Sequence, residues 1–440
     1  MRRLVAAIVL ALVLTACKPP VSPNFVVIIT DDQALSTMDT MPAVQNLLAA
    51  HGMTFTNAFV TTPLCCPSRA SFLTGQRASY HGVETNMDAG LLDPTTTIAV
   101  ALQAKGYTTA LVGKYLNGYT APAFPLTPPV GWSSWFAFFG GERYYNYDVN
   151  VDGSVVSKGS GTADYSTDVF RDAAVWFIAT AQAPFFAYIA PLAPHEPWIP
   201  AVRHAGMFAG RPCPATPATL EADTTDKPDY VQAFQEAAHE GQLEENCAAQ
   251  NLRRETLLAV NDLVAAVVAA VEARGATVLR NTVFVFTSDN GLVDLEHWWE
   301  WKQVPYEASI RVPLVVRYDR WLEAQGETTD ELVLNIDLAP TLAGMAGATL
   351  AYTDGDDWSD FYAGQTGWRV DFPLEYAPSG IPPAWTAVRA AGWKYVLYDD
   401  GFEELYDLVA DPYELDNLAY VEPTPPLLAV ARMRHTELHG

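Results

Sequence analysis

Two apolar, strand-like runs of this chain end directly in oxygen-rich side chains. Asp31 and Asp32 follow a run near the N-terminus, and Asp289 and Asn290 follow a second run far along the chain. In an open α/β sheet, ligands gather beyond the carboxyl ends of the strands, so these side chains are expected to converge. Three carboxylates and one amide oxygen form a hard ligand set of the kind that Ca²⁺ and Mg²⁺ prefer. We therefore predict a divalent-cation site between the two segments.

A second candidate for chemistry is Cys65, which begins the segment Cys-Cys-Pro-Ser-Arg-Ala-Ser-Phe-Leu-Thr-Gly. Pro67 suits the first turn of a helix, and residues 68–73 can continue it, so Cys65 is predicted near a helix N-terminus. Such an end presents free N–H groups and a positive dipole to an anionic ligand. A helix that merely carries two buried cysteines, Cys65 and Cys66, is the alternative interpretation.

The segment 65–75 matches C-x-P-S-R-x-x-x-L-T-G, and over about residues 24–420 the chain resembles the sulfatase family. The resemblance implies that a dedicated maturation enzyme oxidises Cys65 to formylglycine (3-oxoalanine). The hydrated aldehyde is the nucleophile of that family: one of its hydroxyls takes the sulfate ester, and the second then expels sulfate. The expected activity is the hydrolysis of sulfuric esters.

The same resemblance implies a metal centre and an arginine beside residue 65. By this resemblance Asp31, Asp32, Asp289 and Asn290, together with residue 65 itself, bind a divalent cation, usually Ca²⁺ and alternatively Mg²⁺. The cation orients the nucleophile and absorbs developing charge.

Arg69 lies one helical turn from Cys65 and matches the family arginine that hydrogen-bonds formylglycine, a role that suits its fixed donor fork. Lys114 and Lys302 match two lysines that contact the sulfate group. His195, in Pro-His-Glu-Pro, matches the histidine that protonates or steadies the leaving oxygen.

One position departs from the family pattern. Many sulfatases have G-K-x-H where this chain has Gly-Lys-Tyr-Leu, so Leu116 replaces the histidine that deprotonates the formylglycine hydroxyl. Asn117 cannot accept a proton at neutral pH and is predicted to bind substrate instead. His195 and His297 are the remaining candidate bases. We also place His297 among the substrate-binding residues, with a simple surface histidine as the alternative.

The segment 113–117, Gly-Lys-Tyr-Leu-Asn, is similar to the form found in N-acetylglucosamine-6-sulfatases and extracellular heparan endosulfatases. The favoured substrate is therefore a sulfated carbohydrate of the glucosamine 6-sulfate type. A formylglycine-dependent phosphonate or phosphodiester hydrolase of the alkaline phosphatase superfamily is one alternative, and a non-catalytic protein that binds sulfated glycans is another. The clustered Tyr and Trp residues around 132–148 either stack on sugars or form core.

The first residues have the pattern of an export signal. Two arginines precede an apolar run, and Leu-Thr-Ala-Cys at positions 14–17 resembles a bacterial lipobox. We expect residues 1–16 to be a lipoprotein signal peptide and 17–23 a linker. Lipidated Cys17 would tether the protein to a membrane of the bacterial cell envelope, and the alternative is a secreted protein.

Composition supports an exported, folded protein. Half of the 440 residues are apolar, which excludes a disordered chain. The formal net charge of −25 argues against binding nucleic acid. Export permits a disulfide between Cys213 and Cys247, and the sequence leaves open whether the two are bridged.

Alternating strands and helices predict a doubly wound α/β fold. The resemblance implies an alkaline-phosphatase-like mixed sheet sandwiched by helices, and a small C-terminal antiparallel-sheet subdomain. Predicted strands cover 24–30, 107–112, 185–190 and 283–287, and predicted helices cover 97–105 and 251–274. A hairpin is predicted at 393–398 and 404–408, and a long loop at 212–246. The catalytic domain is expected at 24–350 and the subdomain at 351–440.

Overall fold

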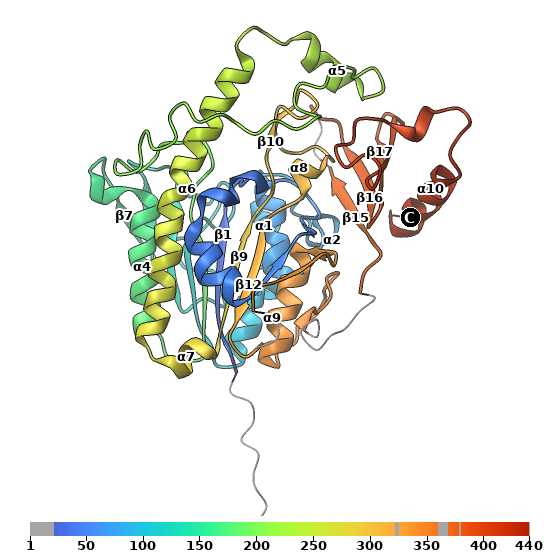
Figure 1. Ribbon diagram of the computed structural model, residues 1–440. Helices are drawn as coiled ribbons and strands as arrows, with labels where there is room; N and C mark the ends of the chain where they lie inside the picture. The colour runs from blue at the N-terminus through green and yellow to red at the C-terminus, as the bar shows by residue number, and fades with distance from the viewer. Residues whose placement is uncertain (1–21, 322–324, 360–367, 378–379, 440) are drawn as a thin grey trace, which may run out of the picture.

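The computed structural model describes residues 22–321, 325–359, 368–377 and 380–439 (Figure 1). The predicted signal peptide and Cys17 lie outside these residues.

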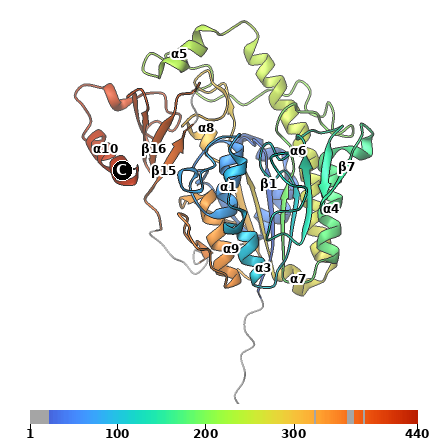
Figure 2. The same cartoon turned by 180° about the vertical axis from the view of Figure 1, so that it is seen from behind.

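A ten-stranded mixed sheet forms the centre of the molecule (Figures 1 and 2). Its strand order is β13-β2-β12-β9-β1-β8-β4-β5-β6-β7, and the five strands from β9 to β5 are parallel. The central strand β1 is buried along its whole length, as its run of apolar residues predicts. The strands of the sheet are β1 (Asn24–Thr30), β2 (Met53–Phe55), β4 (Thr108–Gly113), β5 (Ser134–Phe139), β6 (Asp148–Val151), β7 (Ser154–Ser157), β8 (Phe185–Ala190), β9 (Thr282–Ser288), β12 (Leu314–Tyr318) and β13 (Glu327–Thr329).

Helices cover both faces of this sheet, so the predicted doubly wound class is confirmed (Figure 1). Apolar residues of α1, α3 and α9 pack on one face, and those of α4 and α6 pack on the other. The helices are α1 (Cys65–Thr74), α2 (Ala78–His81), α3 (Ile98–Ala104), α4 (Ser166–Thr180), α5 (Asp229–Glu236), α6 (Gln242–Ala273), α7 (Ala276–Arg280), α8 (Glu307–Ile310), α9 (Leu338–Ala346) and α10 (Pro426–His439).

The predicted strands all form, but one helix and one loop differ from their predictions. Helix α6 begins at Gln242 rather than at residue 251, and α5 lies within the predicted loop 212–246. The first turns of α6 are polar, so the spacing of apolar residues does not reveal where the helix begins. Acidic residues there, Glu244 and Glu245, instead suit a helix N-terminus.

Among the described helices, α6 is long and apolar enough to cross a membrane by length and composition. Its apolar side chains are nevertheless packed into the core, with Val264, Val267 and Val271 fully buried. The helix is therefore explained as a core element of the fold.

A four-stranded antiparallel sheet follows the main sheet, and it confirms the predicted C-terminal subdomain architecture. Its strands are β15 (Asp371–Tyr376), β16 (Trp385–Ala390), β17 (Trp393–Tyr398) and β18 (Glu403–Asp407). It packs on the segment after Lys302: Trp385 donates to the Gln303 carbonyl at 2.8 Å, and Tyr306 donates to buried Glu404 at 2.9 Å. The second sheet thus fixes the segment that carries Lys302. The domain limit at residue 350 stays a prediction.

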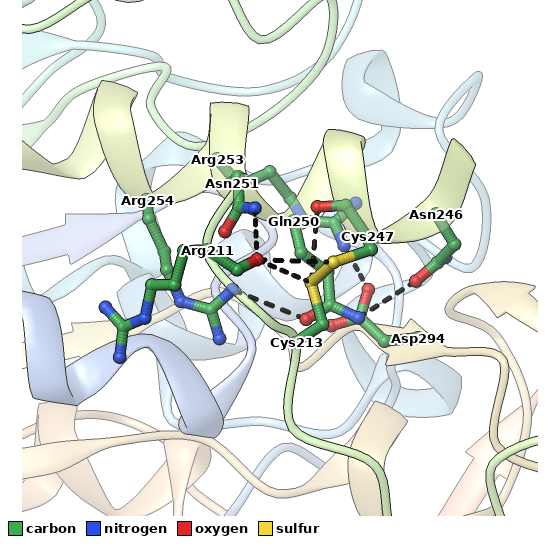
Figure 3. The surroundings of a disulfide bond; sticks show 9 residues. All are labelled: Arg211, Cys213, Asn246, Cys247, Gln250, Asn251, Arg253, Arg254 and Asp294. Carbon is green, nitrogen blue, oxygen red and sulfur yellow. Dashed lines mark hydrogen bonds and ion pairs between the residues drawn. A yellow bond between two sulfur atoms is a disulfide. The ribbon is translucent and has the colours of Figure 1, made fainter. Parts of the chain in front are cut away.

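The disulfide between Cys213 and Cys247 is present (Figure 3). It joins the proline-rich segment before α5 to the N-terminal part of α6, and Asn251 of that helix also donates to the Arg211 carbonyl at 2.8 Å. The disulfide and this hydrogen bond attach the segment between β8 and α6, residues 191–241, to helix α6.

Candidate active site

The paired strands β1 and β9 bring the predicted acids together. Thr30 and Ser288 are neighbours in the parallel ladder, so the residues that follow them leave the sheet side by side. The Asp32 backbone N–H donates to Asp289 Oδ1 at 3.0 Å, and Asp32 has a positive φ of 61°. A residue other than glycine rarely adopts a positive φ without a local reason. At Asp32 this backbone conformation directs the carboxylate into the site.

Cys65 begins α1, as predicted, and lies in this group of acids. Its Sγ is 3.6 Å from Asp31 Oδ1, 3.7 Å from Asp32 Oδ1 and 2.8 Å from Lys302 Nζ. Burial, reinforced by the two carboxylates, raises the pKa of the Cys65 thiol well above its usual range, although two lysines oppose this shift. The unmodified side chain is therefore a neutral thiol.

Three buried cations surround the acids. Lys114 Nζ lies 2.7 Å from Asp31 Oδ2, Arg69 Nε lies 2.9 Å from Asp289 Oδ2, and Lys302 is paired with Asp32. These are the groups that the resemblance assigned to sulfate and formylglycine.

Burial and the neighbouring charges shift the pKa values of two of the carboxyls in opposite directions. Burial would raise the pKa of Asp31, but Lys114 and the other cations outweigh it, so that the pKa lies below its usual range. The pKa of Asp289 is raised, because burial and the charge on Asp31 outweigh Arg69.

His195 follows β8 and reaches the same cluster. Its Nε2 is 3.5 Å from Asp32 Oδ2, and its side chain is 25% exposed, so it stands at the open side of the site. The Tyr144 hydroxyl donates to the His195 carbonyl at 2.7 Å and holds this segment in place. Sequence reasoning did not predict this support, and the only signal for it was the position of Tyr144 in an aromatic run.

The donor set fits a divalent cation. One ligand atom each from Asp31, Asp32, Cys65 and His195 lies within 4.8 Å of the others. Asn290 Oδ1 is buried and has no hydrogen-bond partner among the described residues, while its Nδ2 donates to Asp32 at 2.8 Å. A buried unpaired oxygen is costly, and coordination to a cation would satisfy it.

The two residues that were predicted to bind substrate, His297 and Asn117, have different surroundings. His297 is 1% exposed, its Nδ1 lies 2.6 Å from Glu221 Oε2 and its ring packs on Tyr306, so its contacts are with these residues and not with the Cys65 cluster. The surface-histidine alternative is wrong because the side chain is buried, and the substrate-binding role of His297 stays a prediction. Burial lowers the pKa of His297 to about 3. Asn117 has a buried Oδ1 without a partner among the described residues, and its role stays a prediction.

The aromatic run around residue 140 forms core rather than a sugar platform. Trp132, Tyr144 and Tyr147 are at most 9% exposed, and each packs against other buried rings. Leu116 is likewise fully buried in the apolar core, so no polar group replaces the missing histidine at its position.

Comparison with known proteins agrees with this site. The family described as Sulfatase matches residues 23–348, and the family described as N-sulphoglucosamine sulphohydrolase, C-terminal, matches residues 295–437. An N-acetylglucosamine-6-sulfatase of Homo sapiens is 33% identical over 455 residues, which span 90% of this chain and 81% of the relative. An N-acetylglucosamine-6-O-sulfatase of Bacteroides thetaiotaomicron is 27% identical, over 93% of this chain and 85% of the relative.

Solved structures share the fold at lower identity. A protein in complex with its substrate D-glucosamine-2-N,6-O-disulfate matches with a TM-score of 0.77 and 24% identity, over 95% of this chain and 99% of its own. A phosphonate monoester hydrolase of Agrobacterium radiobacter matches with a TM-score of 0.74 and 20% identity, over 94% and 95% of the two chains. The family match over most of the chain, together with a relative one third identical over nine tenths of it, shows that this chain belongs to the sulfatase family and is a sulfuric ester hydrolase.

Proposed function

We propose that this sulfatase removes the 6-O-sulfate of a glucosamine unit, with a formylglycine at position 65 and a divalent cation as its reactive groups. One observation carries the proposal: Cys65 lies at a helix N-terminus within 4 Å of two carboxylates and a lysine, in a chain that matches N-acetylglucosamine-6-sulfatases over nine tenths of its length. The net reaction breaks one S–O bond, with water supplying a hydroxyl to sulfur and a proton to the sugar oxygen.

Asp31, Asp32, Asp289 and Asn290, together with residue 65, would hold the cation. An all-oxygen set of this kind suits Ca²⁺, and Mg²⁺ is the alternative. When bound, the ion would act as a Lewis acid toward the sulfate oxygens. The unpaired Asn290 oxygen supports this assignment.

A count of charges explains why an anionic ester would bind here. The carboxylates of Asp31, Asp32 and Asp289 are balanced by Lys114, Lys302 and Arg69. A divalent cation would then leave the buried site with excess positive charge. A sulfate ester carries one negative charge and would offset part of this excess, and burial strengthens the attraction.

Each of the three cationic side chains has a proposed role. Lys302 lies against Cys65 and Lys114 against Asp31, so their ammonium groups would bind sulfate oxygens on two sides. Arg69 is buried and paired with Asp289, and it would orient the hydroxyls of the modified residue 65. A dedicated maturation enzyme is required to form that residue.

His195 would protonate the sugar oxygen as the S–O bond breaks, because it is the histidine at the open side of the cluster. We also assign it the deprotonation that usually belongs to the histidine replaced by Leu116. The contacts of His297 with Glu221 and Tyr306 support this choice. Asn117 is retained as a substrate-binding candidate.

The first test is mass spectrometry of the peptide that contains residue 65, on protein from its native host. Formylglycine would lower the mass by about 18 Da relative to cysteine, because an aldehyde replaces a thiol. The same protein should release sulfate from glucosamine 6-sulfate. Faster turnover of a phosphonate monoester would favour the hydrolase of the alternative class. An unmodified Cys65 with tight binding of sulfated glycan would favour the non-catalytic alternative.

We further propose that the protein is exported and lipid-anchored at Cys17 in the bacterial cell envelope. The leader pattern and lipobox at 14–17 support this location. Cys17→Ala should move the protein from the membrane fraction to the soluble fraction. Unchanged membrane association of that variant would contradict the anchor.

A further inference from the structure

A small cavity is lined by segments that flank the reactive cluster, by which we mean Asp31, Asp32, Cys65, His195 and Lys302, and it has no part in the chemistry described so far. Its volume is about 180 Å³, and it lies between the N-terminal half of α6 and the hairpin of β10 (Val293–Asp294) and β11 (Glu300–Trp301). Trp198, Trp301 and Arg253 line it, and we call it the Trp301 pocket. It is smaller than the ~300 Å³ of a drug-sized ligand site, which suits a single sugar ring.

The pocket is tied to the reactive cluster through the chain itself. Trp301 directly precedes Lys302, whose Nζ contacts Cys65, and Trp198 lies three residues after His195. The two segments that supply the leaving-group histidine and a sulfate-facing lysine therefore also supply two walls of the pocket. A pocket whose walls come from these two segments is therefore a candidate for binding the sugar that carries the sulfate.

Two stacked tryptophans form the aromatic wall. The rings of Trp198 and Trp301 lie with centroids 5.7 Å apart and planes within 20° of each other. Trp301 remains 40% exposed, although an indole ring of this size gains by burial. Both residues also have positive φ angles, 53° and 90°. Flat C–H faces of a pyranose ring would cover the open surface of Trp301.

Arg253 supplies the polar wall. It is 4% exposed and paired with Asp294 (Figure 3). Its guanidinium stands 5.3 Å from the centroid of the Trp198 ring. Its Nε is buried and has no hydrogen-bond partner among the described residues. An unpaired buried donor is costly, so a ligand oxygen that accepts from it would be bound specifically. The nearby Cys213–Cys247 disulfide holds this end of α6 in place (Figure 3).

The charges on the pocket select against a second anion. Glu245 and Glu300 line it, and the one cation, Arg253, is already neutralised by Asp294. A further sulfate or carboxylate would face two carboxylates there. Hydroxyl, acetamido and free amino groups would not be repelled.

On the basis of the proposed function, we infer that the Trp301 pocket is a sugar subsite of this sulfatase. A pyranose ring of the substrate stacks on Trp301, accepts a hydrogen bond from Arg253 Nε and carries no anionic group where it meets Glu300. The sulfate group of the same substrate is bound separately, at Cys65 and Lys302.

The test compares wild type, Trp301→Ala and Trp301→Phe on N-acetylglucosamine 6-sulfate, with inorganic sulfate as a competing inhibitor. Trp301→Ala should raise KM roughly five- to tenfold with kcat within about threefold, and Trp301→Phe should restore most of the loss. The Ki of inorganic sulfate should stay within about twofold, because sulfate does not reach the pocket. Trp176→Ala is the matched control, since Trp176 is 64% exposed on α4.

An unchanged KM in Trp301→Ala, in an enzyme whose wild type is active, would overturn the subsite and leave the proposed function standing. Equal changes in KM and in the Ki of sulfate would also overturn it, because Trp301 would then act only through Lys302. Wild type that neither hydrolyses the sugar sulfate nor binds sulfate would refute the proposed function and with it the subsite.

A second variant tests the charge argument. Glu300→Gln should lower KM for glucosamine 2-N,6-O-disulfate more than for N-acetylglucosamine 6-sulfate. Equal effects on the two substrates would overturn the selection against a second anion.

Discussion

Cys65 sits where a thiol is a poor nucleophile and where an anionic ester would be well bound. Burial keeps the thiol neutral, and Lys302 lies 2.8 Å from it. The surrounding charges are therefore arranged for an anion that is brought in, and not for a thiolate. This agrees with the proposal that the reactive form of residue 65 is the oxidised one.

Removing Cys65 should abolish activity and preserve the fold. The alanine of Cys65→Ala cannot be converted to formylglycine, so the variant lacks the proposed nucleophile. Its kcat should fall by about four orders of magnitude or more. Circular dichroism should be unchanged. Cys66→Ala is the matched control, because Cys66 is equally buried and next in the chain. Activity of Cys65→Ala near that of the control would contradict the assignment.

Asp289 should link metal content to activity. Asp289→Asn keeps the side-chain volume but removes the charge that pairs with Arg69 at 2.8 Å. We expect the bound Ca²⁺ and the sulfatase activity to fall together, with a loss of up to about 3 kcal/mol in the free energy of unfolding. Metal analysis of the purified variant is the measurement, and exposed Asp93→Asn is the control. A full metal complement in Asp289→Asn would remove Asp289 from the ligand set.

At the scale of elements, a disulfide and a few buried side chains attach the segment between β8 and α6 (residues 191–241) to the rest of the protein. Its α5 has two buried side chains, Tyr230 and Val231, and the disulfide ties its proline-rich part to α6. The segment after Lys302 is fixed differently, by Trp385 and Glu404 of the C-terminal sheet.

Loss of the disulfide should destabilise the protein measurably. Its two cysteines are 34 residues apart, so in the chain-entropy description the bond contributes about 3–4 kcal/mol. Urea unfolding of Cys213→Ser/Cys247→Ser should show this loss. Reductant should lower the midpoint of wild type and leave the double variant unchanged. An equal effect of reductant on both proteins would show that the disulfide is not the cause.

At the scale of the whole molecule, buried neutral histidines make stability depend on pH. Burial lowers the pKa of His81 to about 4. Its Nε2 lies 3.1 Å from the Ser71 hydroxyl, and its Nδ1 accepts from the Val83 N–H at 3.1 Å. In the unfolded chain this histidine takes up a proton below about pH 6.5, whereas in the folded protein it does so only near pH 4. The stability of the neutral form is therefore lost as pH falls between these values.

His81→Asn should reduce that acid sensitivity. The asparagine oxygen can accept from the Val83 N–H in place of Nδ1, and it does not titrate. Between pH 6.5 and 4, wild type should lose up to about 3 kcal/mol more free energy of unfolding than the variant. Denaturant melts across this range measure the difference. Parallel curves for the two proteins would exclude His81 as a source of acid lability.

The sequence by itself determined the reactive cluster and the class of fold. Cys65, Arg69 and the acids after β1 and β9 are recognisable because each stands in a local motif, and because apolar runs identify the strands that end there. Parallel strands that share an edge then bring distant acids together without further information.

Only the tertiary structure decided how residues that lie close together in the sequence are divided between the site and its surroundings. His297 and Lys302 are five residues apart, yet positive φ angles at His297, Trp298 and Trp301 send the first toward Glu221 and the second toward Cys65. The stacking of Trp198 on Trp301 likewise depends on a contact between distant segments. Such turns and contacts follow from packing in three dimensions, for which residue type and spacing carry no local signal.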